Sequence, residues 1–326
     1  MSMERKRILL AGATGTIGTA TANALVKKGY NTVCLVRPGR NANVLRRDLQ
    51  DVDVREVDVT DPKSLKTDGL RGDVFDAVIS CLASRTGVPS DAWAIDHDAN
   101  LNLLEAAQET HVRHFVLLSA ICVQKPKLGF QEAKLAFEEK LQAAPLTYSI
   151  VRPTAFFKSL SGQLNRLKAG KPFLLFGDGY LTACKPISDE DLAQYLVGCL
   201  CDEALHNKIL PIGGPGPALS PRQQGEALFE ALALQPKFRG VSPRGLDFIV
   251  MLLNGLRWLH PSVRDKAELV RIGRYYATES MLVWDPATAS YNADATPEFG
   301  SDTLSSFYHK LAAGEQQVEL GNHKMF

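Results

Sequence analysis

Three glycines near the start of the chain have the spacing of a phosphate-binding loop. Gly12, Gly15 and Gly18 follow the apolar run RILLA and open a segment of helical periodicity. Glycines permit a tight turn and a close approach of the backbone, and the free N–H groups at the start of a helix attract a pyrophosphate. A strand before the loop and a second strand in phase after the helix therefore predict a dinucleotide site. The residues expected to contact it here are Gly12, Thr14, Gly15, Thr16, Ile17 and Gly18.

Two arginines after the second expected strand bear on the choice of dinucleotide. Arg37 follows this strand directly and Arg40 comes shortly after, where an NAD-preferring site places an acid for the ribose 2′-hydroxyl. A guanidinium at this position pairs with the 2′-phosphate of NADP. A plain surface arginine is the competing interpretation, and the sequence favours NADPH.

The ends of later strands are expected to face the same cofactor. Their order in the fold predicts contacts first with the adenine, then with the pyrophosphate and nicotinamide ribose, and last with the nicotinamide. In that order the residues are Asp58 and Val59; Cys81, Leu82 and Ala83; and Pro153 and Thr154.

Apolar periodicity in the first half indicates the sheet that must position these residues. Short β-branched runs alternate with longer helical segments, which is typical of a parallel α/β sheet. The expected strands are 7–11, 32–36, 52–57, 77–81, 115–119 and 148–151, and the expected helices are 17–28, 62–70, 97–108 and 130–142. The prediction is a doubly wound Rossmann fold with its ligand at the carboxyl ends of the strands.

After Pro153 the rhythm becomes irregular. KPFLLFGDG predicts a strand and turn, KILPIGGPGP a returning strand, and Ser188 and Ser220 each have the pattern of a helix N-cap. We expect a dinucleotide-binding domain over 1–155, and over 156–326 mainly a smaller substrate lobe with some segments returning to the sheet.

Composition narrows the class of partner. The 326 residues are 45% apolar and 22% charged with a formal net charge of +1, so no field that would recruit nucleic acid is indicated. The six cysteines include no C-x-x-C pair, and no signal or transit peptide is visible, so we expect reduced thiols and an intracellular location. Composition carries no indication of the oligomeric state.

Two further segments bear on membrane and metal binding. The apolar segment Gly245 to His260 is too short to span a bilayer; it predicts a buried helix, or alternatively a lid or membrane-surface helix. His111 and His114 lie across a helix-to-strand connection with no third ligand nearby, so no metal site is predicted.

Long sequence blocks carry a family resemblance. The loop, Arg37, Asp58, a helix bearing Asn100 and Asn102, Ser119 and Lys134 together resemble an atypical short-chain dehydrogenase/reductase. Over nearly the whole chain, the blocks that resemble the divinyl chlorophyllide 8-vinyl reductases are ISCLASRTG, HFVLLSAICVQKP, FQEAKLAFE, YSIVRPTAFFKSL, FGDG, CKPISDEDLA, LPIGGPG and IGRYYATESML.

The resemblance implies a reaction and a setting. The reaction is the NADPH-dependent reduction of the 8-vinyl group of a divinyl chlorophyllide or protochlorophyllide to ethyl, in chlorophyll or bacteriochlorophyll synthesis. Plant members carry a transit peptide and none is visible here, so the cytoplasm of a bacterial phototroph is expected, or else a mature form of the protein. Contact with a photosynthetic membrane is a further hypothesis. Two alternatives stay open: a non-catalytic NADP-binding scaffold or redox sensor, and a reductase of another conjugated double bond.

One departure from the superfamily pattern indicates which kind of double bond is reduced. Typical members have Tyr-x-x-x-Lys, in which the phenol protonates an alkoxide, but here Phe130 stands four residues before Lys134. A conjugated vinyl group instead needs hydride at its terminal carbon and a proton on the inner carbon, which requires no phenol beside an alkoxide. Lys134 is the leading proton donor and a contact of the nicotinamide ribose, with Ser119 or Tyr275 and Tyr276 as alternatives.

Aromatic and basic residues are the candidates for holding the macrocycle. Phe156 and Phe157 could face a flat tetrapyrrole, although core packing competes. Arg274 could pair with a propionate, although a solvated helix end competes. The full expected set is Phe130, Phe156, Phe157, Arg274 and Tyr275.

Overall fold

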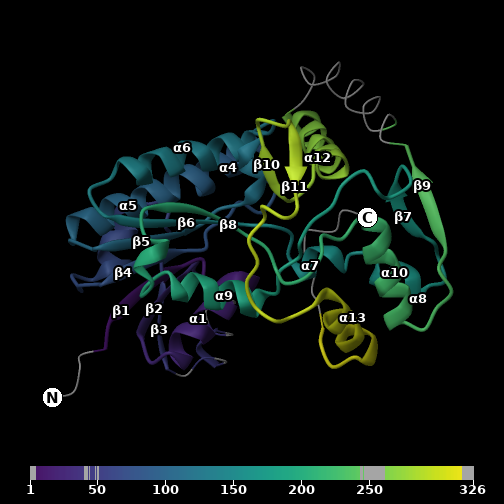
Figure 1. Ribbon diagram of the computed structural model, residues 1–326. Helices are drawn as coiled ribbons and strands as arrows, with labels where there is room; N and C mark the ends of the chain where they lie inside the picture. The colour runs from purple at the N-terminus through teal and green to yellow at the C-terminus, as the bar shows by residue number, and fades with distance from the viewer. Residues whose placement is uncertain are drawn as a thin grey trace.

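A seven-stranded parallel sheet forms the larger part of the molecule (Figure 1). The computed structural model describes residues 5–39, 43, 45–47, 49, 51–242, 245 and 261–317. The strand order is β3-β2-β1-β4-β5-β6-β8. The strands are β1 Arg7–Ala11, β2 Asn31–Val36, β3 Val52–Glu56, β4 Ala77–Ser80, β5 His114–Leu118, β6 Thr147–Pro153 and β8 Lys208–Ile212. The order reverses beside β1, which is where a doubly wound sheet binds its ligand.

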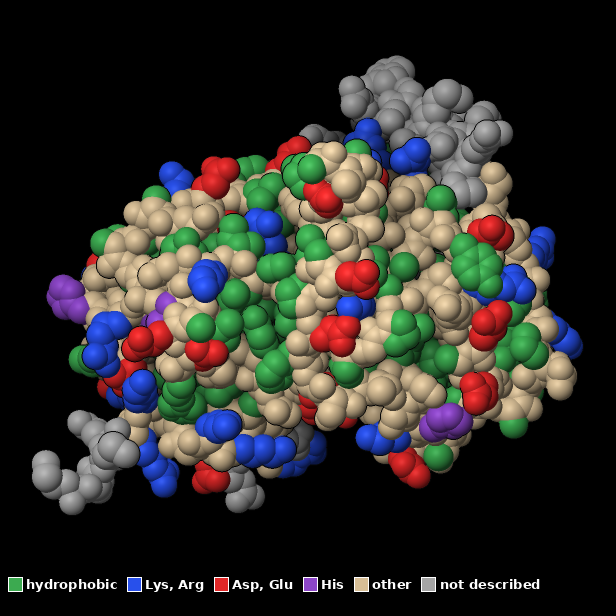
Figure 2. All heavy atoms as spheres, viewed as in Figure 1, with side chains coloured by type: hydrophobic (Ala, Val, Ile, Leu, Met, Phe, Trp, Pro, Cys, Tyr) green, Lys and Arg blue, Asp and Glu red, His purple; other side chains and the backbone are tan. Residues whose placement is uncertain are grey.

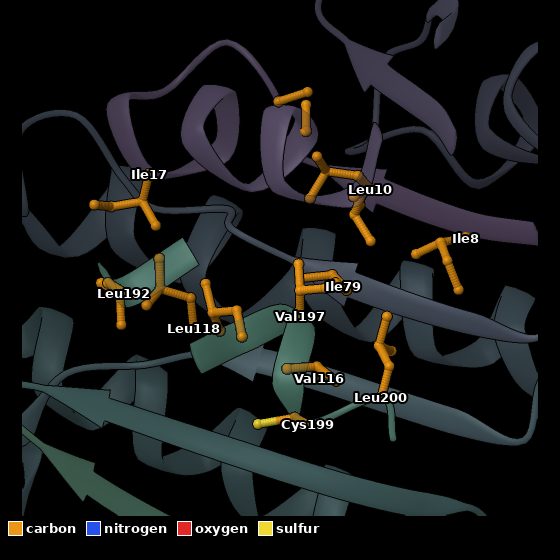
Figure 3. Close-up of a cluster of buried hydrophobic side chains, with 14 of the residues drawn as sticks. Ile8, Leu10, Ile17, Ile79, Val116, Leu118, Leu192, Val197, Cys199 and Leu200 are labelled. Atoms are coloured by element: carbon orange, nitrogen blue, oxygen red, sulfur yellow. The ribbon is translucent and has the colours of Figure 1, made fainter. Parts of the chain in front are cut away.

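Helices cover both faces of the sheet. On one face lie α1 (Thr16–Lys27) and α9 (Asp189–Gly198), and on the other α5 (Asn100–Glu109) and α6 (Gly129–Ala143) (Figure 1). Figure 3 shows the first core, where Leu10 and Ile79 from the strands meet Ile17 of α1 and Leu192 and Val197 of α9. Each such buried side chain contributes about 1.5–3 kcal/mol. Burial from both sides explains why the strands are continuous apolar runs.

The predicted doubly wound fold is confirmed, with corrections to two helices. The segment expected as one helix over 62–70 is a short α3 (Pro62–Ser64) followed by a π-helical turn, η1 (Leu65–Leu70). The helix expected from His97 begins earlier, with α4 (Pro89–Ala92) and a second π-helical turn, η2 (Trp93–Ala99), before α5. Proline at the first helical position starts α4, because its missing N–H would be unpaired there in any case.

A second lobe has a core of its own. Its elements are α7 Phe157–Leu160, α8 Leu164–Lys168, β7 Phe173–Phe176, α10 Pro221–Ala231, β9 Phe238–Val241 and α13 Leu304–Ala313, with β7 and β9 paired in parallel. Phe173, Leu228 and Tyr308 are buried among these elements. The chain returns to the main sheet at α9 and β8, joined by the short η4 (Glu203–Leu205).

Both predicted helix N-caps are confirmed. The Ser188 hydroxyl accepts the Asp191 N–H at 3.0 Å at the start of α9. At α10, Ser220 accepts from the Gln223 N–H at 3.4 Å while the Gln223 side chain accepts from the Ser220 N–H at 2.8 Å. These bonds satisfy N–H groups that a helix start otherwise leaves unpaired.

A third group of elements lies over the end of α6 (Figure 1). It consists of α12 (Pro261–Thr278) and the hairpin β10 (Val283–Asp285) and β11 (Ser290–Asn292). The Glu279 carboxylate joins it to the loop after β5, because it binds Lys125 at 2.7 Å, Lys127, and the Tyr291 hydroxyl at 2.5 Å.

The apolar segment 245–260 and the surface charges bear on membrane and nucleic-acid binding. The helix predicted over 245–260 lies, apart from residue 245, outside the described residues. Within the described part of the chain, no helix has both the length and the apolarity needed to cross a membrane. Acidic and basic side chains are interspersed over the face seen in Figure 2.

Candidate active site

The glycine loop between β1 and α1 is shaped by close backbone contacts. Gly12 has φ +78°, and a Cβ there would lie 2.5 Å from the Cys81 carbonyl oxygen. A Cβ on Gly18 would lie 2.1 Å from the Gly12 oxygen, whereas one on Gly15 would meet only that oxygen, at 3.5 Å. The loop therefore packs closely against neighbouring backbone at Gly12 and Gly18, but has free space at Gly15, where α1 begins. Since Gly15 has no side chain to cap α1, this open side fits a dinucleotide phosphate.

Lys158 reaches the same loop from the second lobe. This residue of α7 donates from Nζ to the Thr16 hydroxyl at 2.9 Å. Asp189 lies nearby, and its pKa is raised to about 6 by burial and by the charge of Glu190, while Lys158 opposes the rise. Sequence reasoning did not single out Lys158, although it lies inside one of the family-like blocks.

The loops after β2 and β3 come together at the adenosine end of the expected site. Arg37 is exposed at the end of β2, and its positive charge acts on Asp58. Hydrogen bonds from the Thr60 hydroxyl at 2.6 Å and the Thr60 N–H at 3.0 Å are the main cause of the lowered pKa of Asp58. Val59 is buried, and its carbonyl accepts from Asn102 at 3.2 Å. Arg40 lies outside the described residues.

The end of β4 lies against the glycine loop. The Cys81 backbone faces Gly12, and burial raises the pKa of the Cys81 thiol to about 12, so it stays protonated. The Leu82 N–H donates to the Ser80 hydroxyl at 3.4 Å, and Ala83 is exposed. These placements bring the predicted pyrophosphate contacts of β1 and β4 to one edge of the sheet.

Lys134 is nearly buried and paired with a carboxylate. Its Nζ lies 2.8 Å from Oδ1 of Asp96, with side-chain exposures of 12% and 0%. The Ser84 N–H donates to the same oxygen at 3.3 Å. Phe130, one turn before Lys134 on α6, is buried in an apolar cluster. Sequence reasoning missed Asp96, since it lies just before the helix expected over 97–108 and no local pattern pairs it with Lys134.

Residues from α12 enter the same cluster. Tyr275 and Tyr276 lie edge to face with ring centroids 5.7 Å apart, beside Phe130 and Cys122. The Tyr275 hydroxyl donates to the Cys122 carbonyl at 2.9 Å, so this side chain is committed to the fold. Burial raises the pKa of Tyr276 well above its usual value, and its hydroxyl interacts with the Cys122 thiol. The charge of Lys134 acts on that same thiol.

Several predicted residues are engaged in the core instead of facing an open site. The Ser119 hydroxyl donates to Glu138 at 2.5 Å, and the same carboxylate binds Arg152. Pro153 is buried, and the Thr154 hydroxyl donates to the Lys185 carbonyl. The Ser119 hydroxyl is thus bonded to a carboxylate one turn beyond Lys134 on α6. The position of Ser119 after an apolar strand predicts an active-site hydroxyl. In the structure this hydroxyl is bonded to Glu138, 19 residues further along the chain.

The candidate residues for binding the macrocycle are either buried or half-buried. Phe157 is 3% exposed and packs against Phe307 with ring centroids 5.4 Å apart, so the expectation that it faces a substrate is corrected. Phe156 is half-buried against the core beneath α9. Arg274 is half-buried on α12, one residue before the cluster at Tyr275.

Metal ligands are not grouped in the described residues. Within those ranges, no three His, Cys, Asp or Glu side chains are close enough to hold a metal ion. His114 is buried on β5, where its ring bonds to Ser149 at 3.0 Å.

Comparisons with known proteins show the family to which the chain is similar. Residues 12–203 match a family model described as NAD(P)H-binding. A chloroplastic divinyl chlorophyllide a 8-vinyl-reductase from Zea mays is 46% identical over 331 residues, which cover 98% of this chain and 82% of that protein. One from Arabidopsis thaliana is 46% identical over 337 residues, covering 96% and 79%.

A solved structure supports the fold. The NADPH-dependent quinone oxidoreductase from Escherichia coli, complexed with NADPH, gives a TM-score of 0.67 at 17% identity, covering 93% of this chain and 99% of that one. At this identity the likeness concerns the fold alone.

Proposed function

The chain belongs to the divinyl chlorophyllide a 8-vinyl-reductase family, and from this premise we propose that it reduces the 8-vinyl group of divinyl chlorophyllide or protochlorophyllide to ethyl. The observation that carries the proposal is the pair of residues at positions 130 and 134 of α6. A charged Lys134 is kept at the expected nicotinamide end, while the acid-base phenol of carbonyl reductases is replaced by a buried Phe130. This combination suits a reaction that protonates carbon.

The proposed reaction takes its hydride from the cofactor and its proton from the protein. NADPH, when bound, supplies the hydride that adds to the terminal vinyl carbon. Negative charge then spreads over the tetrapyrrole, and a proton must reach the inner vinyl carbon to complete the ethyl group. Lys134 presents a positive charge in a nearly dry site, where such a charge stabilises a developing anion strongly. We assign it the proton transfer, directly or through one water.

Tyr276 is the second candidate for the proton donor. It comes from α12, not from α6, yet it shares the apolar cluster with Phe130. Its raised pKa keeps the phenol protonated at neutral pH. Ser119 is disfavoured because its hydrogen is already donated to Glu138.

The choice of NADPH rests on Arg37 at the end of β2. This side chain is exposed toward the adenosine end, and a guanidinium there matches a 2′-phosphate. Lys158 adds a second cation at the α1 end of the loop. The cofactor contacts that we propose are the glycine loop, Arg37, the residues at the ends of β3, β4 and β6, Lys158, and Lys134 at the nicotinamide ribose.

The substrate is proposed to lie between α6 and α12. Phe130 contributes an apolar wall there, and Arg274 is proposed to bind a propionate carboxylate. Phe156, which packs on the α9 side of the sheet, is proposed as a substrate contact beyond the end of β6, and Tyr275 as the support that fixes α12 by its bond to the Cys122 carbonyl. An unchanged Michaelis constant in Arg274→Ala would remove that arginine from the proposal.

The setting of the reaction is also proposed. The plant relatives are chloroplastic by name, and we place this protein in the cytoplasm of a bacterial phototroph with its substrate close to a photosynthetic membrane. Flotation of the protein with vesicles of anionic lipid tests the membrane contact.

The proposed activity has a direct optical test. Protein, NADPH and divinyl chlorophyllide are mixed, and the Soret band is followed. Conversion of a conjugated vinyl to ethyl shortens the conjugated system, so a blue shift is expected. No shift with intact NADPH binding would instead support a non-catalytic NADP-binding protein.

A further inference from the structure

We propose that Asp96 is a positioning residue for the vinyl reduction, acting by holding the Lys134 ammonium in place. The inference rests on the proposed function of Lys134. Asp96 lies on η2, a different element from α6, so no local sequence pattern pairs the two residues.

The geometry of the pair is that of a buried, specific contact. Oδ1 of Asp96 lies 2.8 Å from Lys134 Nζ, and the Asp96 side chain is fully buried. Its other oxygen, Oδ2, is buried and has no hydrogen-bond partner among the described residues. An unpaired buried carboxylate oxygen costs free energy, and such a cost is tolerated most readily where a ligand or water completes the site.

The backbone that carries Asp96 is held in an uncommon form. Residues 93–99 are a π-helical turn, a form that occurs frequently at functional sites. Asn100 fixes its end, because its Nδ2 donates to the Asp96 carbonyl at 3.2 Å. The Ser80 hydroxyl at the end of β4 bonds to the Asn100 side-chain oxygen at 2.5 Å. A chain of contacts thus ties the carboxylate to the sheet edge that faces the expected cofactor.

The position of the usual phenol offers Lys134 no polar partner here. In a Tyr-x-x-x-Lys site the cation lies one helical turn from a hydroxyl, whereas here that position is the apolar ring of Phe130. A buried ammonium without an opposite charge is costly. Asp96 therefore supplies the opposite charge that holds the Lys134 side chain in place.

A neighbouring acid offers a matched control. Asp98 lies on the same turn, but its side chain is 63% exposed and contacts His97. We expect Asp96→Asn to lower kcat about 100-fold, since misplacement by about 1 Å costs that much. The Michaelis constant for the pigment should change little, and the NADPH dissociation constant, measured by fluorescence, should rise only modestly through the ribose contact expected of Lys134. Asp98→Asn should leave all three unchanged.

A double variant separates positioning from general stability. If Asp96 acts through Lys134, adding Asp96→Asn to Lys134→Met should cause no further loss of kcat. A further loss comparable to that of the single Asp96→Asn variant would overturn the inference, as would wild-type kcat in Asp96→Asn itself. If Asp96→Asn does not fold, Asp96→Glu replaces it, with an expected loss of about 10-fold from displacement of the ammonium. Wild-type kcat in a folded Asp96→Glu would then overturn the inference.

A readout that needs no turnover completes the test. Acylation of the Lys134 amine, followed by peptide mass spectrometry in the protein without substrate, should be faster in Asp96→Asn than in wild type and in Asp98→Asn. An unchanged rate contradicts the pairing. If wild type itself gives no Soret shift, the proposed function fails, whereas the acylation rates still decide the pairing.

Discussion

At the residue scale, the site is defined by a cation whose usual partner is absent. Lys134 is retained, its expected phenol is replaced by Phe130, and a carboxylate from another element lies against it. A carbonyl reductase needs a hydroxyl beside its alkoxide, but reduction of a vinyl group ends on carbon. The same residues that would disable the first reaction are compatible with the second.

The first prediction concerns this cation. Lys134→Met should lower kcat by 100-fold or more, roughly the contribution of a positioned proton donor, while Phe130→Tyr should stay within about threefold of wild type because no alkoxide needs the added phenol. Steady-state reduction of divinyl chlorophyllide measures both. Normal turnover by the Lys134 variant would remove its role.

Arg37 carries the second prediction at this scale. Arg37→Gln removes a charge-assisted contact with the 2′-phosphate, so NADPH affinity should fall by about 10- to 100-fold. Affinity for NADH, which lacks that phosphate, should hardly change. Fluorescence titration with both cofactors measures the ratio; an equal loss for both would mean that Arg37 does not read the phosphate.

At the element scale, three junctions bring the site together. The π-helical turn η2 faces α6, α7 reaches the glycine loop through Lys158, and α12 is fixed to the loop after β5. Glu279 stabilises the last junction, where Lys125 also lies 3.9 Å from the centroid of the Trp284 ring. The pKa of Glu279 is lowered to about 2. Burial alone would raise it, but the hydrogen bonds from Lys125, Lys127 and Tyr291 outweigh that effect.

Loss of this carboxylate should therefore be costly. Glu279→Gln should lower the free energy of unfolding by about 3 kcal/mol, since it removes a 9% exposed carboxylate and leaves the partly buried Lys125 poorly paired. Glu109→Gln is the matched control, because its pair with Lys66 is exposed on both sides and should contribute under about 1 kcal/mol. Urea denaturation of both variants measures the difference; equal losses would contradict the role of the junction.

A histidine on β5 predicts the pH dependence of stability. Burial, with the charges of His206 and Lys6, lowers the pKa of His114 to about 4. Between pH 6.5 and 4 the unfolded chain takes up this proton and the folded chain does not, so stability falls as the pH falls. The loss should approach about 3 kcal/mol near the lower limit.

Substitution isolates the contribution of this group. His114→Gln should flatten the decline of unfolding free energy between pH 6.5 and 4, whereas the exposed His309→Gln should leave it as in wild type. Denaturation at several pH values provides the comparison. Parallel curves for the His114 variant and wild type would show that another group is responsible.

At the scale of the whole molecule, sequence reasoning was most successful where structure follows from local pattern. The strands of the first half were predicted to within a residue or two, because strands buried on both faces must be continuous apolar runs. Ser188 and Ser220 were identified as caps from residues within one turn. The contacts made by Asp96, Ser119 and Phe157 could not be predicted, since each partner lies at least 19 residues away.

The central claim is that hydride from NADPH and a proton from the protein reduce one vinyl group. Divinyl chlorophyllide should be incubated with NADPH that carries deuterium in the transferred position, and the pigment analysed by mass spectrometry together with its Soret band. The account predicts one deuterium in the new ethyl group, on its terminal carbon, with a blue-shifted band. A blue-shifted product without deuterium, or no product while NADPH binds, would contradict it.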